Sequence, residues 1–579
     1  MISSALNLAA GSLKAQQKAM DVVANNMANV NTPGYSRQSS QMSSAIPVQQ
    51  GGLNFGRGVQ LSNISRTVDP IINQAMLKNN GQQGYWQNLQ TGLTNVETSF
   101  GSLQNTGLSA AIDDFFAATQ QMANAPQDVA QKINVSSKSV ALATRLSDMS
   151  RQLTSAQTQS DVKITQDITS VNQLLDQVGA LNTQILKAEG ASQGVVGAAN
   201  DLRDQRDQAI RDISKFMPVQ QVKVNNGGVL LQSMGGDLLV QDNVVNHLAR
   251  STNLAANGFQ DVVIASTQQT VAGITQSGTI GGSIALRDDR LGGYLTKLDS
   301  IAVNLAFGIN QANASGVGST QASTITSGQG VLNQALPVND VAQKNPFSAQ
   351  MVVPGSFTIH AYDSAGTPLI PASQATISVT ATSTMASIAT AISGSGLGVT
   401  ASVDVGGRLV MNAGVNKMGF ANDTSNFLAT YQINNIFQGT NAATMQVSAA
   451  VQADAGLIAT GKIDAVTSSI QVGDNQSALQ MMNLQNAAVS FDGSNSVSLS
   501  ARTSTLSTIY GNDVALATQQ TSFHTAEASS LMQQRQALSG VNVDEELVNM
   551  IKYQRSYEAS AKIIQTSNQM LSTLMGLIR

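Results

Sequence analysis

The chain has 579 residues, more than a single hydrophobic core can organise, so we expect several domains. Its net charge is −4 and only 11% of its residues are charged, so neither nucleic acid nor an anionic membrane is indicated as a partner. The chain has no cysteine, which excludes disulfides, thiolate metal sites and cysteine nucleophiles.

The histidines give no sign of a catalytic or metal site. His247, His360 and His524 lie far apart in sequence, and none belongs to a ligand-spaced pair. Their number leaves room for a Ser-His-Asp site, but no nucleophile-elbow motif accompanies them. We predict no catalytic residue, no bound metal and no cofactor.

The first residues lack the basic segment and the continuous apolar segment of a Sec signal peptide, so we do not expect one. No run of 18 apolar residues occurs, which predicts no transmembrane helix and no membrane insertion.

The two ends of the chain carry similar helical stripes. Near the start the stripe contains Leu6, Leu13, Gln16, Met20, Val23, Met27 and Val30. Near the finish it contains Leu547, Met550, Gln554, Tyr557, Ile564, Asn568, Leu571, Met575 and Ile578. Steps of three and four are typical of a coiled-coil seam, and isolated helices are marginal in water. We therefore predict that the two helices pair; the alternative is that each lies on an ordinary globular core.

A register for this pairing follows if the helices run antiparallel with Leu6 beside Ile578. Gln16 would then face Asn568, and two buried amides that bond to each other can fix a register.

The first helix is expected to stop at the Pro33-Gly34 turn. Residues 36–70 are then expected to form an extended, partly stranded connector. Helical periodicity returns at Tyr85 and again over residues 108–122. Residues 126–189 are expected to form a long helix, which would be a rod of about 90 Å if it is continuous. The helix could break near residues 155–161.

Charges at helical spacing over residues 201–213 predict a solvated or interhelical salt-bridge face that includes Arg203, Asp207 and Arg211. Short strands follow at 222–224, 229–231 and 238–240, with glycine-rich turns at 225–228 and 235–237. These glycines are not followed by a lysine at Walker spacing, which disfavours a phosphate site.

A helix resumes over residues 291–309, and residues 315–460 predict a strand-rich module. Its strands are expected at 357–359, 376–379, 399–403 and 409–411, with a helix over 383–392. The chain is expected to be helical from residue 473, apart from a loop near 491–500. Asn542 and Glu545 resemble a capping box for the last helix, which disfavours a catalytic carboxylate pair there.

The predicted fold is α+β and multidomain. Residues 1–70 with 535–579 form a discontinuous coiled-coil assembly domain. Residues 71–315 with 462–534 form an elongated helical domain with β hairpins near 219–285. Residues 316–461 form an inserted β-rich domain.

Two terminal motifs carry a resemblance to a known family. Residues 24–35 (ANNMANVNTPGY), continued by SRQ, and residues 539–546 (SGVNVDEE) with 553–562 (YQRSYEASAK) resemble the FlgK family of flagellar hook-associated proteins, within the flagellar axial proteins. The family motif residues are Asn25, Asn26, Asn29, Asn31, Thr32, Pro33, Gly34, Tyr35, Asp544 and Glu545. Interior segments 203–207, 281–288 and 473–475 agree, and the likeness is looser across 315–460.

The resemblance implies a non-enzymatic, extracellular subunit at the junction between hook and filament. Its copies would form a ring or helical lattice, contacting the hook protein and a second junction protein (FlgL). Export would proceed unfolded through the flagellar type III channel, with a chaperone (FlgN) on the C-terminal helix. We expect the ends to be disordered in the free monomer, because ordering costs entropy that burial has not yet offset.

Three other functions stay open. The nearest is another axial protein, of the hook or distal rod. A flagellum-associated wall hydrolase would need two converging carboxylates, whereas the acidic residues here sit in cap or salt-bridge contexts. A membrane-inserting translocator is disfavoured by the low basic content.

Overall fold

The computed structural model describes residues 2–50, 53–100, 107–191, 197, 199–223, 228–255, 257–344, 352–369, 373–464, 466–487 and 497–576. The chain forms two compact units, both discontinuous in sequence. Unit 1 contains Met1–Gly92, Gln159–Arg287 and Ala515–Arg579, and unit 2 contains Leu93–Thr158 and Asp288–Val514.

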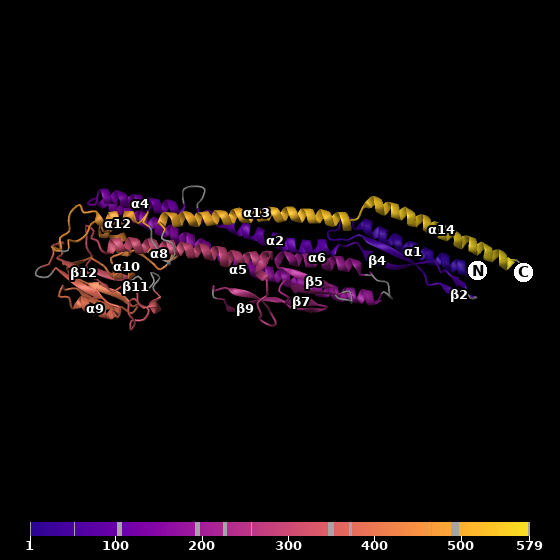
Figure 1. Ribbon diagram of the computed structural model, residues 1–579, viewed down its shortest axis with the longest axis horizontal. Helices are drawn as coiled ribbons and strands as arrows, with labels where there is room; N and C mark the ends of the chain where they lie inside the picture. Colours follow the sequence, from indigo (N-terminus) through magenta and orange to yellow (C-terminus); the bar gives the residue numbers. More distant parts are fainter. Residues whose placement is uncertain are drawn as a thin grey trace. The chain divides into compact units, whose positions relative to one another are not determined.

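The two ends of the chain lie together in unit 1 (Figure 1). Helix α1 (Ile2–Ala28) packs along α14 (Val543–Gly576), as the terminal stripes predicted. The connector after α1 forms β1 (Gln38–Ser44), β2 (Val48–Gln50), β3 (Leu53–Phe55) and β4 (Val59–Arg66). Strand β1 pairs antiparallel with β4, and β2 with β3, so the predicted extended connector is a two-part hairpin on which α1 also packs.

Helix α2 (Pro70–Asn95) begins fifteen residues before Tyr85, the predicted start, so that prediction was wrong. Asp69 caps it, because its Oδ1 accepts a hydrogen bond from Ile71 N at 2.7 Å, and proline is well suited to the first helical position. Its first turns carry apolar residues, including Ile72 and Leu77, and Leu77 belongs to the buried core of unit 1. Further along the helix the packing is close, since a Cβ at Gly84 would lie 2.4 Å from the Lys215 carbonyl oxygen.

Helix α5 (Val129–Ala191) runs unbroken for 63 residues, so the break allowed near residues 155–161 does not occur. Its second half packs in unit 1 against α6 (Asn200–Phe216) and a four-stranded antiparallel sheet. The sheet contains β5 (Val219–Lys223), β6 (Val229–Ser233), β7 (Leu238–Gln241) and β8 (Val244–Val245). The three strands predicted in this region are confirmed; the predicted turn at 225–228 lies mostly outside the described residues.

The rest of unit 1 closes this core. Strands β9 (Leu248–Leu254) and β10 (Gln260–Ile264) pair with each other. They are followed by a short turn of helix, η1 (Ile274–Gln276), by α7 (Gly278–Ile284) and by a π-helical turn, η2 (Ala285–Leu291), which continues into unit 2.

Unit 2 has a helical part built on aromatic packing. Its helices are α3 (Glu97–Phe100), α4 (Leu108–Asn124), the first half of α5, α8 (Gly292–Ala314), α12 (Gln476–Asn483) and the first part of α13 (Leu499–Ser539). The Phe100 ring stacks on Tyr510 with 4.1 Å between centroids, and Tyr294 meets Phe100 edge-on.

The strand-rich module of unit 2 has two three-stranded sheets, ordered β13-β12-β16 and β11-β15-β14. Their strands are β11 (Thr324–Gly330), β12 (Gly355–Tyr362), β13 (Gln374–Val379), β14 (Thr400–Val403), β15 (Arg408–Asn412) and β16 (Lys417–Ala421). Helix α9 (Met385–Ser393) shares their core. The predicted strands and helix of this module are confirmed, as is the predicted α+β multidomain fold class.

Short elements complete unit 2. They are η3 (Val341–Gln343), α10 (Phe427–Thr430), β17 (Phe437–Gln438), β18 (Gln446–Val447), α11 (Ala449–Ala453) and η5 (Ala455–Leu457). The predicted loop near 491–500 lies mostly outside the described residues, and its last two positions already belong to α13.

His360 on β12 is fully buried. Its Nδ1 lies 2.9 Å from Ser468 Oγ, while its Nε2 has no hydrogen-bond partner. Burial lowers the pKa of His360 to about 4 from an ordinary 6.5.

This burial predicts acid sensitivity of the strand-rich module. Below pH 6.5 the unfolded chain protonates at His360 and the folded chain does not, so the free energy of unfolding should fall down to about pH 4. The loss should reach about 3 kcal/mol. His360→Gln should flatten this slope in calorimetric unfolding between pH 7 and pH 4; equal slopes in both proteins would contradict the prediction.

Candidate assembly site at the paired chain ends

Two polar contacts define how α1 and α14 pair. Ser12 Oγ lies 3.0 Å from Ser560 Oγ, and Asn26 Nδ2 donates to Glu546 Oε2 at 3.1 Å. Fourteen residues separate the contacts along α1, and fourteen separate them in the opposite direction along α14. The helices are therefore antiparallel and keep one register over this length.

The predicted register was wrong. In the observed one, Gln16 falls opposite Ser556, whereas Asn568 lies twelve residues further along α14, about 18 Å away. The observed register is not a slip by whole heptads, because twelve is not a multiple of seven, so the alignment does not follow the apolar stripes. Small and polar pairs select it here.

The face that α1 buries consists mainly of small side chains. They are Ala9, Ala15, Ala19, Val22, Val23 and Asn26. Of the predicted seam on this helix, Val23 is buried and Val30 is exposed; half-buried are Leu6, Leu13, Gln16, Met20 and Met27. Because α1 packs on both α14 and the hairpin, alanines allow close approach on two sides. The seam predicted from the sequence consists mainly of larger side chains, and Ala15 and Ala19 lie outside its stripe.

Helix α14 buries only Glu546, Ser560 and Ser567 among its described residues. Of the predicted seam on α14, Met550 and Ile564 are half-buried. Exposed are Leu547, Gln554, Tyr557, Asn568, Leu571 and Met575; Ile578 lies outside the described residues. Most of the apolar surface of α14 therefore has no partner within the chain.

The turn after α1 is built around Asn26. Its Oδ1 accepts hydrogen bonds from Gln38 N at 3.0 Å and from the Tyr35 hydroxyl at 2.8 Å. Its Nδ2 also donates to Gln38 O at 2.8 Å. The turn reverses at Gly34, which has φ of 86°, and a Cβ there would lie 2.9 Å from Gln208 Oε1.

The other motif residues before Gly34 brace or cover this turn. Asn29 Nδ2 donates to Asn25 Oδ1 at 2.8 Å, and Thr32 Oγ1 donates to Asn29 Oδ1 at 3.0 Å. Asn31 and Pro33 are exposed. The N-terminal motif is therefore a rigid turn between α1 and β1.

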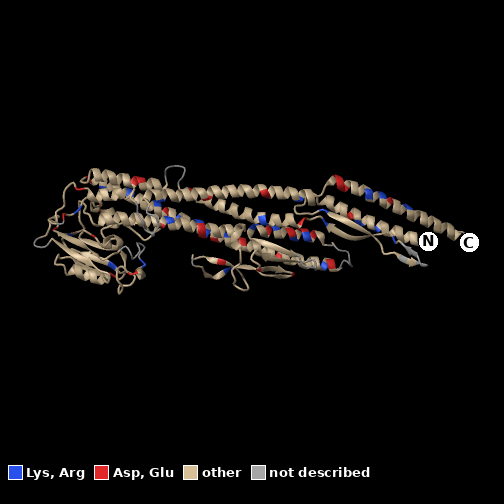
Figure 2. Cartoon of the chain, in the orientation of Figure 1, with Lys and Arg blue, Asp and Glu red and all other residues tan. Residues whose placement is uncertain are grey.

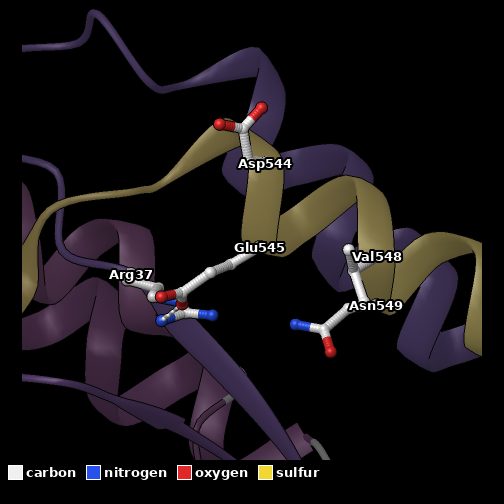
Figure 3. Close-up of a pocket in the computed structure, with 5 residues that line it drawn as sticks. All are labelled: Arg37, Asp544, Glu545, Val548 and Asn549. Carbon is white, nitrogen blue, oxygen red and sulfur yellow. Dashed lines mark hydrogen bonds and ion pairs between the residues drawn. The ribbon is translucent and has the colours of Figure 1, made fainter.

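Arg37 links this turn to the start of α14 (Figure 3). Its Nε donates to Glu546 Oε1 at 2.8 Å and its Nη1 to Glu545 Oε2 at 2.7 Å. Its backbone N–H donates to Ser539 O, at the end of α13, at 2.9 Å. Arg37, Asp544, Glu545, Val548 and Asn549 line an open hollow of about 470 Å³.

Asn542 caps α14 as predicted, since its Oδ1 accepts from Asp544 N at 3.0 Å. The predicted capping box is not completed by Glu545, whose carboxylate pairs with Arg37 instead.

Carboxylates of α6 hold the other side of the turn. Asp204 accepts from Ser36 N at 3.0 Å and from Arg66 Nη1 at 2.7 Å, and Asp201 accepts from Gln38 Nε2 at 2.6 Å. Burial raises the pKa of Asp204 even though Arg66 opposes that shift.

The charged face predicted on α6 forms ion pairs with other elements, one of them interhelical as the prediction allowed. Asp207 binds Arg66 of β4 at 3.0 Å, and Arg203 pairs with Glu189. Helical spacing within α6 could not reveal Arg66, which lies more than 130 residues earlier in the chain.

The polar groups of this site hold segments of the chain together. Its buried carboxylates are paired with guanidinium groups, amides or backbone N–H groups. Across the described residues, no group of three or more His, Asp or Glu side chains is placed to hold a metal ion. No described helix combines the length and the apolar character needed to cross a membrane.

Four family models match the chain. Residues 93–325 match the flagellar hook-associated protein FlgK helical domain, and residues 356–415 match the flagellin hook IN motif. Residues 6–35 match the flagella basal body rod protein model, and residues 532–577 match the flagellar basal body rod FlgEFG protein C-terminal model. The last two matches contain α1 and α14.

Relatives agree along the whole length. Flagellar hook-associated protein 1 of Salmonella typhimurium is 25% identical over 596 residues, covering 100% of both chains. The protein of the same name in Escherichia coli K12 is 24% identical over 588 residues, also covering 100% of both. The chain belongs to the FlgK family of flagellar hook-associated proteins. This is a family of structural flagellar proteins, and the chain is not an enzyme.

A solved structure shares the fold. The flagellar hook junction protein FlgK from Burkholderia pseudomallei is 18% identical with a TM-score of 0.50. The match covers 81% of this chain and 100% of that chain.

The register of the terminal helices predicts a selective cross-link. Because the chain has no native cysteine, Ser12→Cys with Ser560→Cys should form one disulfide under mild oxidation, as the two side chains are already in contact. Gln16→Cys with Asn568→Cys is the matched control and should stay reduced. Mobility on a non-reducing gel distinguishes them; a cross-link in the second pair alone would reverse the assigned register.

Glu546 should matter more than its neighbour Glu545. Glu546→Ala removes the carboxylate from Asn26 and Arg37 in a buried setting and should lower local stability by about 1–3 kcal/mol. Glu545→Ala removes a carboxylate that is 57% exposed from Arg37 and should cost less than about 1 kcal/mol. Amide exchange at the start of α14 measures both, and equal effects would contradict the assignment.

Proposed function

We propose that the protein is a structural subunit of the bacterial flagellum at the junction between hook and filament, and that its paired ends are its assembly surface. The carrying observation is that α14 buries only three polar side chains in the single chain and leaves most of its apolar side chains exposed. Family membership supports the place of the protein in the flagellum.

The exposed side chains of α14 supply an energetic reason to assemble. Exposed fractions are 42% at Leu547, 51% at Ile551, 48% at Leu574 and 68% at Met575. Each would contribute roughly 1.5–3 kcal/mol if neighbouring subunits buried it completely. Because little of this is realised in one chain, the ends of a free subunit should exchange their amide protons quickly.

The overhang of α14 continues the stripe that faces α1. Leu571 lies four residues after buried Ser567 and eleven after Ser560, which places all three on one face of the helix. In the observed register, residues from Leu571 onward extend past the start of α1, so this part of the stripe has no partner on the described part of α1.

The predicted partners follow from this placement. Copies of the chain would contact one another, with hook protein on one side and the second junction protein (FlgL) on the filament side. Before assembly, an export chaperone (FlgN) would cover the C-terminal helix. Export would proceed through the flagellar type III channel.

The three-part domain division is kept as a proposal. Residues 1–70 with 535–579 would assemble, residues 71–315 with 462–534 would extend from them, and residues 316–461 would form an insertion. The contacts of Arg37 with Glu545 and Glu546 support the first grouping, because they join its two sequence segments.

The location of labelled protein on intact flagella tests the proposed function. Gold labelling confined to the junction would support it. Label along the whole hook, or in the rod, would favour the alternative of another axial protein.

A charge on the overhang predicts a specific assembly defect. Leu571→Asp should leave the purified chain folded, because Leu571 is already 38% exposed, yet should reduce filament-bearing cells about tenfold by placing a carboxylate in an apolar contact. Leu254→Asp makes the same change at a leucine that is 67% exposed on β9, away from the paired ends, and should assemble normally. Normal filaments with Leu571→Asp would exclude the overhang as an assembly contact.

A further inference from the structure

Helix α14 has a second surface, on the side away from α1. It consists of side chains at steps of four and three that are all exposed, and we call it the outer face of α14: Asp544, Val548, Ile551, Arg555, Glu558 and Lys562. The alternation of these steps keeps the six side chains on one side of the helix over five turns.

The outer face is divided by charge. It begins with Asp544, beside the Arg37–Glu545 pair, and continues with Val548 and Ile551, which are 66% and 51% exposed. Beyond them lie Arg555 and Lys562, with the single acidic residue Glu558 between them. Figure 2 shows this order, with acidic residues at the start of α14 and basic residues further along.

These opposite charges cannot meet inside one molecule. Eleven residues of rigid helix separate Asp544 from Arg555, about 16 Å, and eighteen separate it from Lys562, about 27 Å. Across the described part of the chain, no oppositely charged group lies within ion-pairing distance of Asp544, Arg555 or Lys562.

We propose that the outer face of α14 binds the outer face of α14 in a second copy of this chain, displaced along the helix axis so that Asp544 of one copy lies beside Arg555 and Lys562 of the next. This inference rests on the proposed function. A second copy is the occupant that the charges favour, because every copy presents both the acidic start and the basic stretch on the same face.

The arrangement is head-to-tail. The two helices are parallel and displaced, so two different parts of one face meet and each copy keeps a free acidic start or a free basic stretch for the next copy. An antiparallel pair would join the same charges twice and close the contact, which does not suit a subunit of a continuous axial structure. Val548 and Ile551 lie between the two charged parts and would be covered by the neighbour. Their burial would supply attraction, while the charges would select the displacement and disfavour like-charged alignments.

Charge reversal on a single chain tests the contact. In cells that lack the native protein, Asp544→Lys alone places like charges against each other at every contact, as does Arg555→Glu with Lys562→Glu. Each variant should reduce filament-bearing cells at least about fivefold, because the repulsion of like charges is repeated at every subunit. The three changes combined in one chain restore opposite charges at every contact and should return filaments to within about twofold of wild type.

The combined variant also controls for folding, since it contains every substitution. A matched combination replaces the basic stretch with exposed lysines of α1: Asp544→Lys with Lys14→Glu and Lys18→Glu. If the combination with the α1 lysines restores filaments and the combination with Arg555→Glu and Lys562→Glu does not, Asp544 contacts α1 of the next copy, and the proposal is overturned. Failure of both combinations would mean that a different protein occupies the outer face.

Two further results would overturn the inference while leaving the proposed function intact. One is normal filament formation by the single charge reversals in cells where the wild-type chain localises to the junction. The other is a closed, two-fold dimer of the full-length wild-type chain in sedimentation experiments at low salt, because two α14 helices would then pair antiparallel. Absence of the wild-type chain from the junction would instead remove the proposed function itself.

Discussion

The terminal part of unit 1 depends on a buried group of three side chains contributed by both ends of the chain. Asn26 and Arg37 come from the N-terminal segment, and Glu546 comes from the first turn of α14. Glu546 is only 2% exposed, so its charge requires these donors. Asn26 also accepts a hydrogen bond from Gln38 N in the turn that follows α1, and the backbone N–H of Arg37 donates to Ser539 O at the end of α13. One small cluster therefore fixes the exit of α1, the start of β1 and the bend between α13 and α14.

A polar clamp of this kind leaves the apolar surface of the last helix available. If α1 and α14 had paired through their large apolar residues, the single chain would have buried the surface on which assembly depends. The observed interface instead uses alanines on α1 and two serines with a glutamate on α14. Close approach of small residues gives modest stability, which suits a segment that gains most of its burial from neighbouring subunits. The proposed junction role and the proposed contact between outer faces both follow from this division.

The confirmed predictions concern interactions between residues close in sequence, and most of the wrong ones concern contacts between residues far apart in sequence. The α5 rod, the strands of the strand-rich module and the Asn542 cap were predictable because periodicity and capping are local properties. The start of α2 was missed because the few apolar residues of its first turns are followed by the polar, glycine-containing stretch 78–84, which hides the helical period. The partners of Asp204 and Asp207 were missed because Arg66 comes from a distant strand. The predicted terminal register was wrong because it aligned the large apolar stripes, whereas the two helices meet through small and polar side chains.

The sequence by itself determined that both ends are helices that need partners, that a turn follows the first of them, and that the chain carries the motifs of flagellar hook-associated proteins. These features depend on residues within a few turns of one another. Only the tertiary structure decided which faces of the two helices meet, in which register, and which apolar side chains stay exposed. The reason is that these outcomes depend on a few hydrogen bonds and ion pairs between residues as far apart as Asn26 and Glu546, whose geometry no local pattern encodes.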